Sequence, residues 1–187
     1  MDKLKEKFKM SYFIANKIYL FIIFIFLVAQ DLTLGFYYFL ISIFVYAWKA
    51  LRASVPIGVD KEFKSNTFVY KRTKNRDLKL DIWYPLKNSG PYPLVFFCHG
   101  GGWISGFRNQ SNNVSWCKFL ASKGFAVVSI DYRYGYRNTM EDILSDYTDA
   151  LNYVKKNSKK LSIDKEKIVL MGLSAGGHLS LLYSTYY

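Results

Sequence analysis

The segment from Lys167 to Leu179 constrains the fold more than any other part of the chain. It reads KIVLMGLSAGGHL, an apolar run of strand character that ends in small residues and continues as a helix. A chain that turns sharply from strand to helix needs small residues two positions before and after the turning residue. That residue is Ser174, and Gly172 and Gly176 flank it. The segment therefore predicts a strand–turn–helix unit with Ser174 at its tip, where the unpaired N–H groups of the helix start favour negative charge.

A second glycine-rich turn, HGGGW at His99–Trp103, follows another apolar run, PLVFFCH at 93–99. Consecutive glycines cost conformational entropy on folding, so they need an explanation. One interpretation is a flexible turn. The other is a backbone that approaches a ligand closely and directs N–H groups at one point, as a loop does when it stabilises the oxyanion of a tetrahedral intermediate.

Strand and helix patterns alternate through the rest of this region. Residues 66–71 and 78–85 alternate apolar and polar side chains and predict an antiparallel pair. The run at 93–99 is continuously apolar, as expected of a strand that is covered on both faces. Another buried strand is predicted at 125–132, and the next strand at 167–172. Helices are predicted at 111–123, which ends at Gly124, and over 140–157. The second has its apolar residues at helical spacing, namely Ile143, Tyr147, Ala150, Leu151 and Val154. The pattern predicts an α/β fold: a mixed, mostly parallel sheet with helices on both faces.

The front of the chain has a different character. Residues 18–29 and 36–48 are almost unbroken apolar runs, and extended to 12–29 and 33–51 each approaches the roughly 20 residues that span a bilayer. Lysines and arginines lie before the first run and after the second, whereas the intervening turn QDLT has none. By the positive-inside rule this predicts a transmembrane helical hairpin at 1–52 with both ends in the cytoplasm. A linker at 53–65 and a hydrolase-like domain at 66–187 would follow.

Two alternatives to the hairpin remain open. The lysine-rich start and the first apolar run are also typical of a signal peptide. The second run would then stay as a single anchor, with the domain outside the cytoplasm, although LVAQD is a poor cleavage site. The other alternative is that the apolar runs are buried helices of a soluble protein. Attachment to a lipid bilayer is the prediction that the first two interpretations share.

Charge and cysteine usage exclude several function classes. The formal charge is +12, but the basic residues are scattered or flank the apolar runs, and no nucleic-acid-binding motif accompanies them. Cys98 and Cys117 lie in apolar or amphipathic segments, which indicates buried free thiols. The sequence contains no metal-ligand cluster, phosphate loop or dinucleotide fingerprint. No cofactor, metal or nucleic-acid partner is therefore expected.

The two glycine turns and their flanking strands resemble the α/β-hydrolase superfamily, specifically its HGGG-type esterase and lipase branch, which includes hormone-sensitive-lipase-like and bacterial feruloyl-esterase-like proteins. The resemblance runs from about Val69 to the last residue and includes LKLDIWYP, PLVFFCHGGGWISG, GFAVVSIDYRY, DALNYVKKN and IVLMGLSAGGHLSLL. It implies a carboxylic-ester hydrolase acting on small-molecule esters, with Ser174 as nucleophile. It also implies an oxyanion hole from the backbone N–H groups of Gly101, Gly102 and Ala175, and a loop-shaping role for His99 and Gly100.

The same resemblance implies a catalytic acid and a histidine after the serine, and the sequence does not provide them at the expected positions. The family places an acid and then a histidine after the serine, but no acidic residue follows Glu166, and the last histidine, His178, lies one helical turn after Ser174. Packing explains His178 better than proton transfer does. The strand at 167–172 would also be an unpaired edge, although it is expected to be central in the complete fold. The sequence therefore predicts a hydrolase truncated after the serine turn and nearly inactive as it stands, or else a non-catalytic membrane-anchored scaffold that binds a partner. Trp103 and the segment 131–134 are candidates for the pocket entrance, although core packing explains them equally well.

Overall fold

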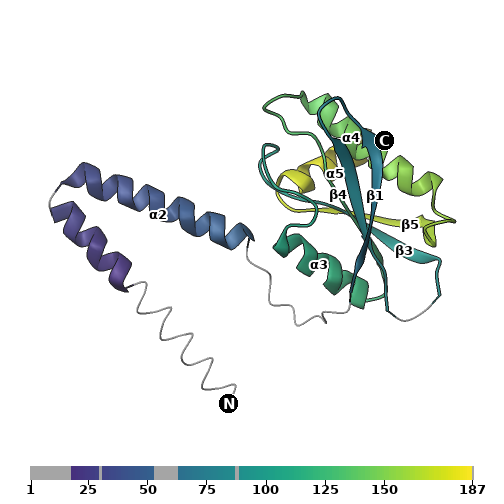
Figure 1. Ribbon diagram of the computed structural model, residues 1–187, viewed down its shortest axis with the longest axis horizontal. Coiled ribbons are helices and arrows are strands. Elements are labelled where there is room, and N and C mark those ends of the chain that lie inside the picture. The colour runs from purple at the N-terminus through teal and green to yellow at the C-terminus, as the bar shows by residue number, and fades with distance from the viewer. Residues whose placement is uncertain (1–17, 30, 53–62, 87–88, 187) are drawn as a thin grey trace, which may run out of the picture. The chain divides into compact units, whose positions relative to one another are not determined.

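The structure is a computed structural model that describes residues 18–29, 31–52, 63–86 and 89–186 (Figure 1). The chain divides into two compact units, Met1–Leu51 and Arg52–Tyr187. Most of the predicted linker, residues 53–62, lies outside the described residues. The chain resumes at Phe63, whose side chain is buried in the second unit.

The N-terminal unit contains two apolar helices, one over Ile18–Ala29 and α2 over Leu32–Arg52. Asp31 connects them: its carboxylate accepts a hydrogen bond from the backbone N–H of Thr33 at 2.7 Å, which satisfies one of the free donors at the start of α2. The helices approach closely at Gly35, where a Cβ would lie 2.4 Å from Cγ2 of Val28. The predicted turn QDLT at 30–33 is shorter than expected, because α2 already includes Leu32 and Thr33, and residue 30 lies outside the described residues.

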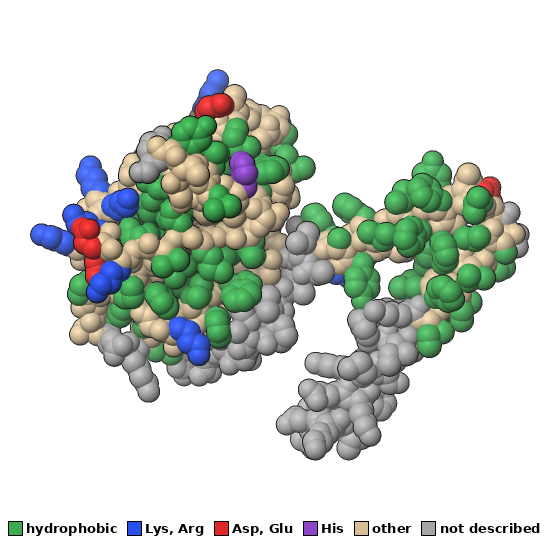
Figure 2. Space-filling view, turned by 180° about the vertical axis from the view of Figure 1, so that it is seen from behind, with side chains coloured by type: hydrophobic (Ala, Val, Ile, Leu, Met, Phe, Trp, Pro, Cys, Tyr) green, Lys and Arg blue, Asp and Glu red, His purple; other side chains and the backbone are tan. Residues whose placement is uncertain are grey.

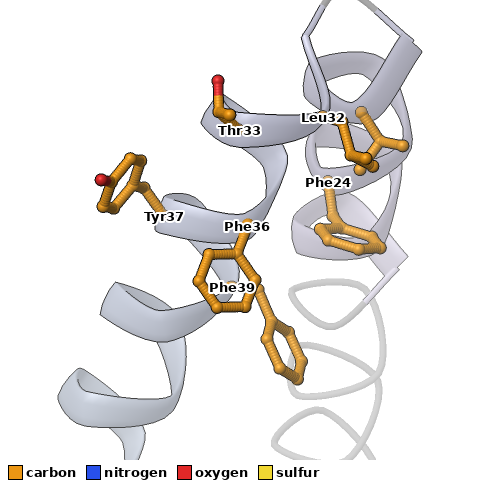
Figure 3. A pocket seen from close by; sticks show the side chains of 7 residues that line it. Phe24, Leu32, Thr33, Phe36, Tyr37 and Phe39 are labelled. Carbon is orange, nitrogen blue, oxygen red and sulfur yellow. The ribbon is translucent and has the colours of Figure 1, made fainter.

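An apolar notch of about 500 Å³ lies beside this turn (Figure 3). It opens between the two helices, and the aromatic rings of Phe24 and Phe39 meet there with their centroids 6.0 Å apart. Its other lining residues are Val28, Leu32, Thr33, Phe36 and Tyr37.

The length of α2 matches a membrane span. Its 21 residues extend about 32 Å at roughly 1.5 Å per residue, close to the hydrocarbon thickness of a bilayer. The window Leu32–Lys49 has a mean hydropathy of 1.3, and only 6% of it is buried. The helix at Ile18–Ala29 is shorter, and residues 12–17 of the first predicted span lie outside the described part of the chain. Within the described ranges, α2 is the one helix with the length and composition to cross a membrane.

The second unit is built on a five-stranded sheet in the order β1-β2-β4-β3-β5. β1 pairs with β2 and β2 with β4 in antiparallel fashion, whereas β3 pairs with both β4 and β5 in parallel. The strands are β1 (Ser65–Arg72), β2 (Asp77–Trp83), β3 (Tyr92–Cys98), β4 (Ala126–Ile130) and β5 (Ile163–Gly172). The predicted mixed sheet is confirmed. The first two strands in the sequence form an antiparallel pair, and the later strands β3, β4 and β5 pair in parallel.

Helices cover both faces of this sheet (Figure 1). They are α3 (Ser111–Ser122), α4 (Met140–Lys156) and α5 (Ala175–Tyr186). The larger core lies beneath α4 and α5 and contains all five residues whose spacing predicted α4, namely Ile143, Tyr147, Ala150, Leu151 and Val154. The smaller core lies beneath α3, where Cys117 and Ala121 pack on the opposite face of the strands. A capping box between Thr139 and Asp142 starts α4.

β5 forms one edge of the sheet and begins four residues before its predicted start at Lys167. Residues 163–164 pair with the beginning of β3, the register then shifts past the charged residues 165–167, and pairing resumes at Ile168. The outer side of β5 has no neighbour among the described strands, and Val169 is 55% exposed. Figure 2 shows hydrophobic side chains gathered at the centre of one face of this unit. The edge position that the sequence predicts for this strand is present.

Candidate active site

Ser174 stands at the turn between β5 and α5 with a φ of +50°, in the left-handed region that L-residues rarely adopt. Holding a non-glycine residue there costs about 1–3 kcal/mol and persists only when the surroundings fix it. Backbone hydrogen bonds on either side supply that constraint. The N–H of Leu173 donates to the carbonyl of Cys98 at 3.1 Å, and the N–H of His178 donates to the carbonyl of Ser174 at 3.0 Å. The serine side chain is exposed at the tip.

The glycines around the serine are required by close backbone contacts. A Cβ on Gly172 would lie 2.2 Å from the carbonyl carbon of Gly176. A Cβ on Gly176 would lie 2.1 Å from the carbonyl oxygen of Cys98, at the end of β3. Neither distance is compatible with a side chain unless the backbone moves. The first turn of α5 therefore rests directly on the end of the neighbouring strand, and this contact sets the sharpness of the turn.

The HGGGW loop lies against the same turn. A Cβ on Gly100 would lie 3.3 Å from Cβ of Ser174 and 2.8 Å from the carbonyl oxygen of Leu173. The next residues adopt positive φ one after another, with +132° at Gly101, +60° at Gly102 and +62° at Trp103. The two predicted motifs, more than 70 residues apart in sequence, are thus neighbours in space.

The backbone N–H groups assigned to the oxyanion hole are available at this turn. Among the described residues, none accepts a hydrogen bond from the N–H of Gly101, Gly102 or Ala175. Ala175 is the first residue of α5, where the helix macrodipole also favours negative charge. The carbonyl of Gly101 is occupied, since it accepts from the N–H groups of Ile104 and Ser105 at 3.2 and 3.0 Å. Unbonded N–H donors in the glycine loop and directly after Ser174 are the groups that oxyanion stabilisation requires.

His99 is buried beneath the loop and is committed to structural contacts. Its Nδ1–H donates to the carbonyl of Gly100 at 2.7 Å, and its ring stacks on Tyr132 with the centroids 4.3 Å apart. Burial lowers the pKa of His99 from 6.5 to about 4, so the ring is neutral near pH 7. These contacts are consistent with the loop-shaping role that the family resemblance implies for His99.

His178 is exposed, and its ring lies edge-on to Trp103, with the centroids 5.3 Å apart. No side-chain hydrogen bond joins it to Ser174 in the described part of the chain. The described buried acids are Asp81, Asp131 and Asp146, and each is paired with an arginine. The structure therefore brings Ser174 and the glycine loop together. Among the residues that it describes, no acid–histidine pair lies at the serine.

For the segment 131–134, which follows β4, the sequence left open whether the residues line a pocket entrance or pack in the core. Asp131 accepts from Arg108 at 2.8 Å, and Arg133 donates from Nε to Asp146 at 2.7 Å. Tyr132 is fully buried, and its hydroxyl donates to the carbonyl of His99 at 3.0 Å. Packing against the glycine loop, and not a position at a pocket entrance, accounts for Tyr132. One signal was available, since the segment and the loop both follow adjacent parallel strands and must emerge at the same edge of the sheet.

The remaining chemistry-bearing residues stay apart from the serine. Cys98 and Cys117 are buried free thiols, as predicted, and burial raises the pKa of both well above the ordinary value. Within the described ranges, no group of three or more histidine, cysteine or acidic side chains is arranged to hold a metal ion.

A sequence model of the BD-FAE family matches residues 80–187, which is more than half of the chain and includes both glycine turns. The chain belongs to the BD-FAE family. The α/β-hydrolase resemblance of the HGGG and GLSAG motifs is thereby confirmed, as is its place among the esterases related to hormone-sensitive lipase.

Several relatives of this BD-FAE chain are named as ester hydrolases. The probable carboxylic ester hydrolase LipM of Mycobacterium tuberculosis is 39% identical over 106 residues, covering 55% of this chain and 24% of that protein. The probable isoprenylcysteine alpha-carbonyl methylesterase ICME of Oryza sativa subsp. japonica is 34% identical over 102 residues, covering 54% of this chain and 24% of that protein. The chain thus spans about a quarter of the length of these curated relatives.

Solved structures lead to the same group of proteins. The native structure of the thermophilic esterase Est2 from Thermogutta terrifontis aligns with a TM-score of 0.57 at 35% identity. The alignment covers 62% of this chain and 42% of Est2. The second unit, Arg52–Tyr187, contains the residues that match the BD-FAE family and is called the BD-FAE unit below. It corresponds to part of an esterase fold.

Proposed function

We propose that the BD-FAE unit is the nucleophile-bearing part of a membrane-anchored carboxylic-ester hydrolase that acts through an acyl-enzyme on Ser174. The observation that carries the proposal is the strained φ of +50° at Ser174, on a turn that contacts the glycine loop at Gly100. Residues strained in this way cluster at active sites, where the surrounding structure holds them in place. The esterase names of several relatives support ester hydrolysis as the reaction class.

In the proposed reaction, Oγ of Ser174 attacks the ester carbonyl carbon and gives up its proton to a base. The carbonyl oxygen becomes an oxyanion that accepts hydrogen bonds from the N–H groups of Gly101, Gly102 and Ala175. The bond to the leaving alcohol oxygen then breaks, and the alcohol takes the proton. Water subsequently attacks the acyl group on Ser174 and releases the carboxylic acid, which restores the serine.

Among the described residues, neither histidine and none of the buried acids is placed to act as the base or to orient it. Asp81, Asp131 and Asp146 are ion-paired with arginines, His99 is buried and neutral, and His178 packs on Trp103. An oxyanion hole without its triad retains only residual catalysis. We therefore expect the 187-residue polypeptide by itself to hydrolyse esters slowly, and Ser174 to react faster when a base is supplied.

The membrane part of the proposal rests on the exposed apolar surface of α2 and on its length. We propose that α2 and the helix at Ile18–Ala29 form a hairpin anchor, with the hydrolase unit in the cytoplasm. A single span with the unit on the other side is the alternative. Several relatives are named for esters of isoprenylcysteine, so an ester carried on a lipid-like group is a substrate class that suits an enzyme held at a bilayer.

The first test supplies the missing base from solution. The full chain in detergent micelles is incubated with a fluorophosphonate, with and without imidazole, and the product is measured by intact mass and peptide mapping. We expect one adduct, on Ser174, which forms at least about tenfold faster with imidazole, in the range typical of general-base assistance. Ser174→Ala should abolish it. The matched control Ser122→Ala removes a serine on α3 and should leave it unchanged.

Two results would contradict the proposal. An adduct on another residue, or none with imidazole, would remove Ser174 as the nucleophile. Rapid hydrolysis of an aryl ester by the wild-type chain without imidazole would instead show that a base is already present among the 187 residues.

A non-catalytic scaffold is the second candidate function. The open edge of β5, where Val169 is 55% exposed, favours it because such an edge can pair with another polypeptide. The same experiment separates the two candidates, since a scaffold without a reactive serine yields no imidazole-dependent adduct.

A further inference from the structure

The glycine loop at 99–106 cannot hold its own shape. Gly101, Gly102 and Trp103 adopt positive φ in succession, and Trp103 does so with a bulky side chain. Inside the loop, the carbonyl of Gly101 accepts from Ile104 and Ser105, and the carbonyl of Gly100 accepts from Nδ1–H of His99. A strained backbone of this kind persists only when neighbouring structure fixes it from outside.

The first outside contact comes from Tyr132, just after β4. Its hydroxyl donates to the carbonyl of His99 at 3.0 Å, and its ring stacks on the His99 imidazole at an interplanar angle of 16°. Tyr132 is fully buried. It therefore fixes both the backbone and the side chain of the residue at which the loop begins.

The second contact comes from Tyr134 and Gly135 and fixes the middle and the end of the loop. The hydroxyl of Tyr134 donates to the carbonyl of Gly106, and the N–H of Gly135 donates to the carbonyl of Trp103 at 2.8 Å. Gly106 itself is wedged against the start of the loop, because a Cβ there would lie 2.3 Å from the carbonyl oxygen of Gly100. The segment 132–135 thus contacts the loop at its beginning, middle and end.

This segment is in turn held by the rest of the fold. The Arg76 guanidinium donates to the carbonyl of Tyr132 and lies 4.7 Å above the ring of Tyr134. The neighbouring Arg133 is bound by Asp146 of α4, whose carboxylate is fully buried and also receives Lys71 of β1. The segment is therefore held by the ion pair of Arg133 with α4 and by the contacts of Arg76.

We propose that Tyr132 and Tyr134 are positioning residues for the ester-hydrolysing site, in that their hydroxyl groups hold the glycine loop so that its N–H groups remain aimed at the oxyanion beside Ser174. The assignment rests on the proposed function. The tyrosines touch no reacting atom; they act through the backbone of residues 99–106. Removing either hydroxyl should loosen the loop and slow chemistry at Ser174 without weakening the initial binding of a reagent.

The test uses the full chain in detergent micelles and the variants Tyr132→Phe and Tyr134→Phe. Each keeps its ring and loses one hydroxyl. The matched control is Tyr84→Phe, which loses a hydroxyl that donates at 3.0 Å to the carbonyl of Leu161, a residue outside the glycine loop and its supporting segment. Reaction with a fluorophosphonate at saturating imidazole gives a maximal rate of Ser174 modification and a half-saturating reagent concentration. Amide hydrogen exchange over 100–106 reports on the loop itself.

We expect each loop variant to lower the maximal rate about tenfold, since small displacements of oxyanion donors have large kinetic effects. The half-saturating concentration should stay within about twofold, and exchange at Ile104 and Ser105 should quicken about fivefold, as for the loss of one hydrogen bond. Tyr84→Phe should change neither the rate nor the exchange.

Each other outcome overturns the assignment. Unchanged exchange would mean that the hydroxyl groups do not hold the loop. Faster exchange with an unchanged maximal rate would mean that the loop is held for folding and not for chemistry. A wild-type chain that forms no adduct on Ser174 would overturn the proposed function and this assignment with it, and that failure is recognisable because it precedes any comparison of variants.

Discussion

Two strained backbone segments meet at the candidate active site, and they are held in different ways. The turn at Ser174 is fixed by direct backbone contact, because α5 rests on the end of β3 and leaves no room for a side chain at Gly172 or Gly176. The glycine loop at 99–106 is fixed by hydroxyl groups and a backbone N–H from the segment after β4. The first arrangement is steric and local. The second combines close backbone contacts inside the loop with hydrogen bonds from a separate element, and these hydrogen bonds can be lost one at a time.

The difference has a consequence for how each segment tolerates change. Steric contact between backbones cannot be relieved by rotating a side chain, so a substitution there must move a strand or a helix. A hydrogen-bonded loop can lose one donor and keep its approximate path, at a cost of about 1 kcal/mol per bond. The serine turn should therefore respond to substitution with loss of stability, and the loop with loss of alignment.

The largest expected effect comes from Gly176→Ala. The added Cβ would lie 2.1 Å from the carbonyl oxygen of Cys98, and we expect a loss of about 3 kcal/mol in the free energy of unfolding. Urea unfolding of the full chain in micelles, followed by circular dichroism, measures it. The matched control is Gly177→Ala, whose Cβ would lie 3.2 Å from the carbonyl oxygen of Gly172 and which should stay within about 1 kcal/mol of wild type. Equal effects of the two substitutions would refute the steric account of the turn.

The next largest expected effect is a pH dependence of the free energy of unfolding, which arises from His99 at the start of the glycine loop. The folded-state pKa of His99 is lowered to about 4, so between that value and 6.5 the unfolded chain binds a proton that the folded chain does not. The stability that depends on a neutral His99 is therefore fully present above pH 6.5 and is lost as the pH falls toward 4. From pH 7 to pH 5 this single group should lower the free energy of unfolding by about 2 kcal/mol.

The measurement compares urea unfolding at pH 7 and pH 5 in the wild-type chain, His99→Gln and His178→Gln. His99→Gln should lack this part of the pH dependence, and His178→Gln should keep it because His99 remains. If His99→Gln does not fold, the imidazole proton resonances of the wild-type chain followed by NMR give the answer instead. A His99 resonance that titrates near pH 6.5 would show that the ring is not held neutral by burial.

The smallest expected effect is the difference in stability between two substitutions at Ser174, which tests whether the turn imposes a strained backbone there. Because Ser174 has a φ of +50° and an exposed side chain, Ser174→Gly should relieve backbone strain while removing little packing. We expect Ser174→Gly to be more stable than Ser174→Ala by about 1 kcal/mol, measured by thermal unfolding. Equal stability of the two variants would mean that the turn does not impose the left-handed conformation in solution.

Much of the fold was accessible from local patterns. The spacing of Ile143, Tyr147, Leu151 and Val154 predicted α4 because a buried helix face repeats every 3.6 residues whatever it packs against. The continuous apolar runs predicted β3 and β4 as strands covered on both sides, since neither face of such a strand meets water. The start of β5 was missed because residues 164–167 read as charged loop, and only pairing of Ile163 with Tyr92 makes that stretch a strand.

The same distinction between local patterns and tertiary contacts applies to the candidate active site. The sequence by itself determined which residues form sharp turns, since glycine and small residues at fixed spacing around Ser174 and after His99 are a local requirement of the backbone. Only the tertiary structure decided that the two turns touch, that His99 is neutral and that Tyr132 and Tyr134 support the loop. These are contacts between residues about 30 or more positions apart, and local residue patterns say little about which distant groups will meet. Burial, which sets the pKa of His99, likewise exists only once the strands have come together.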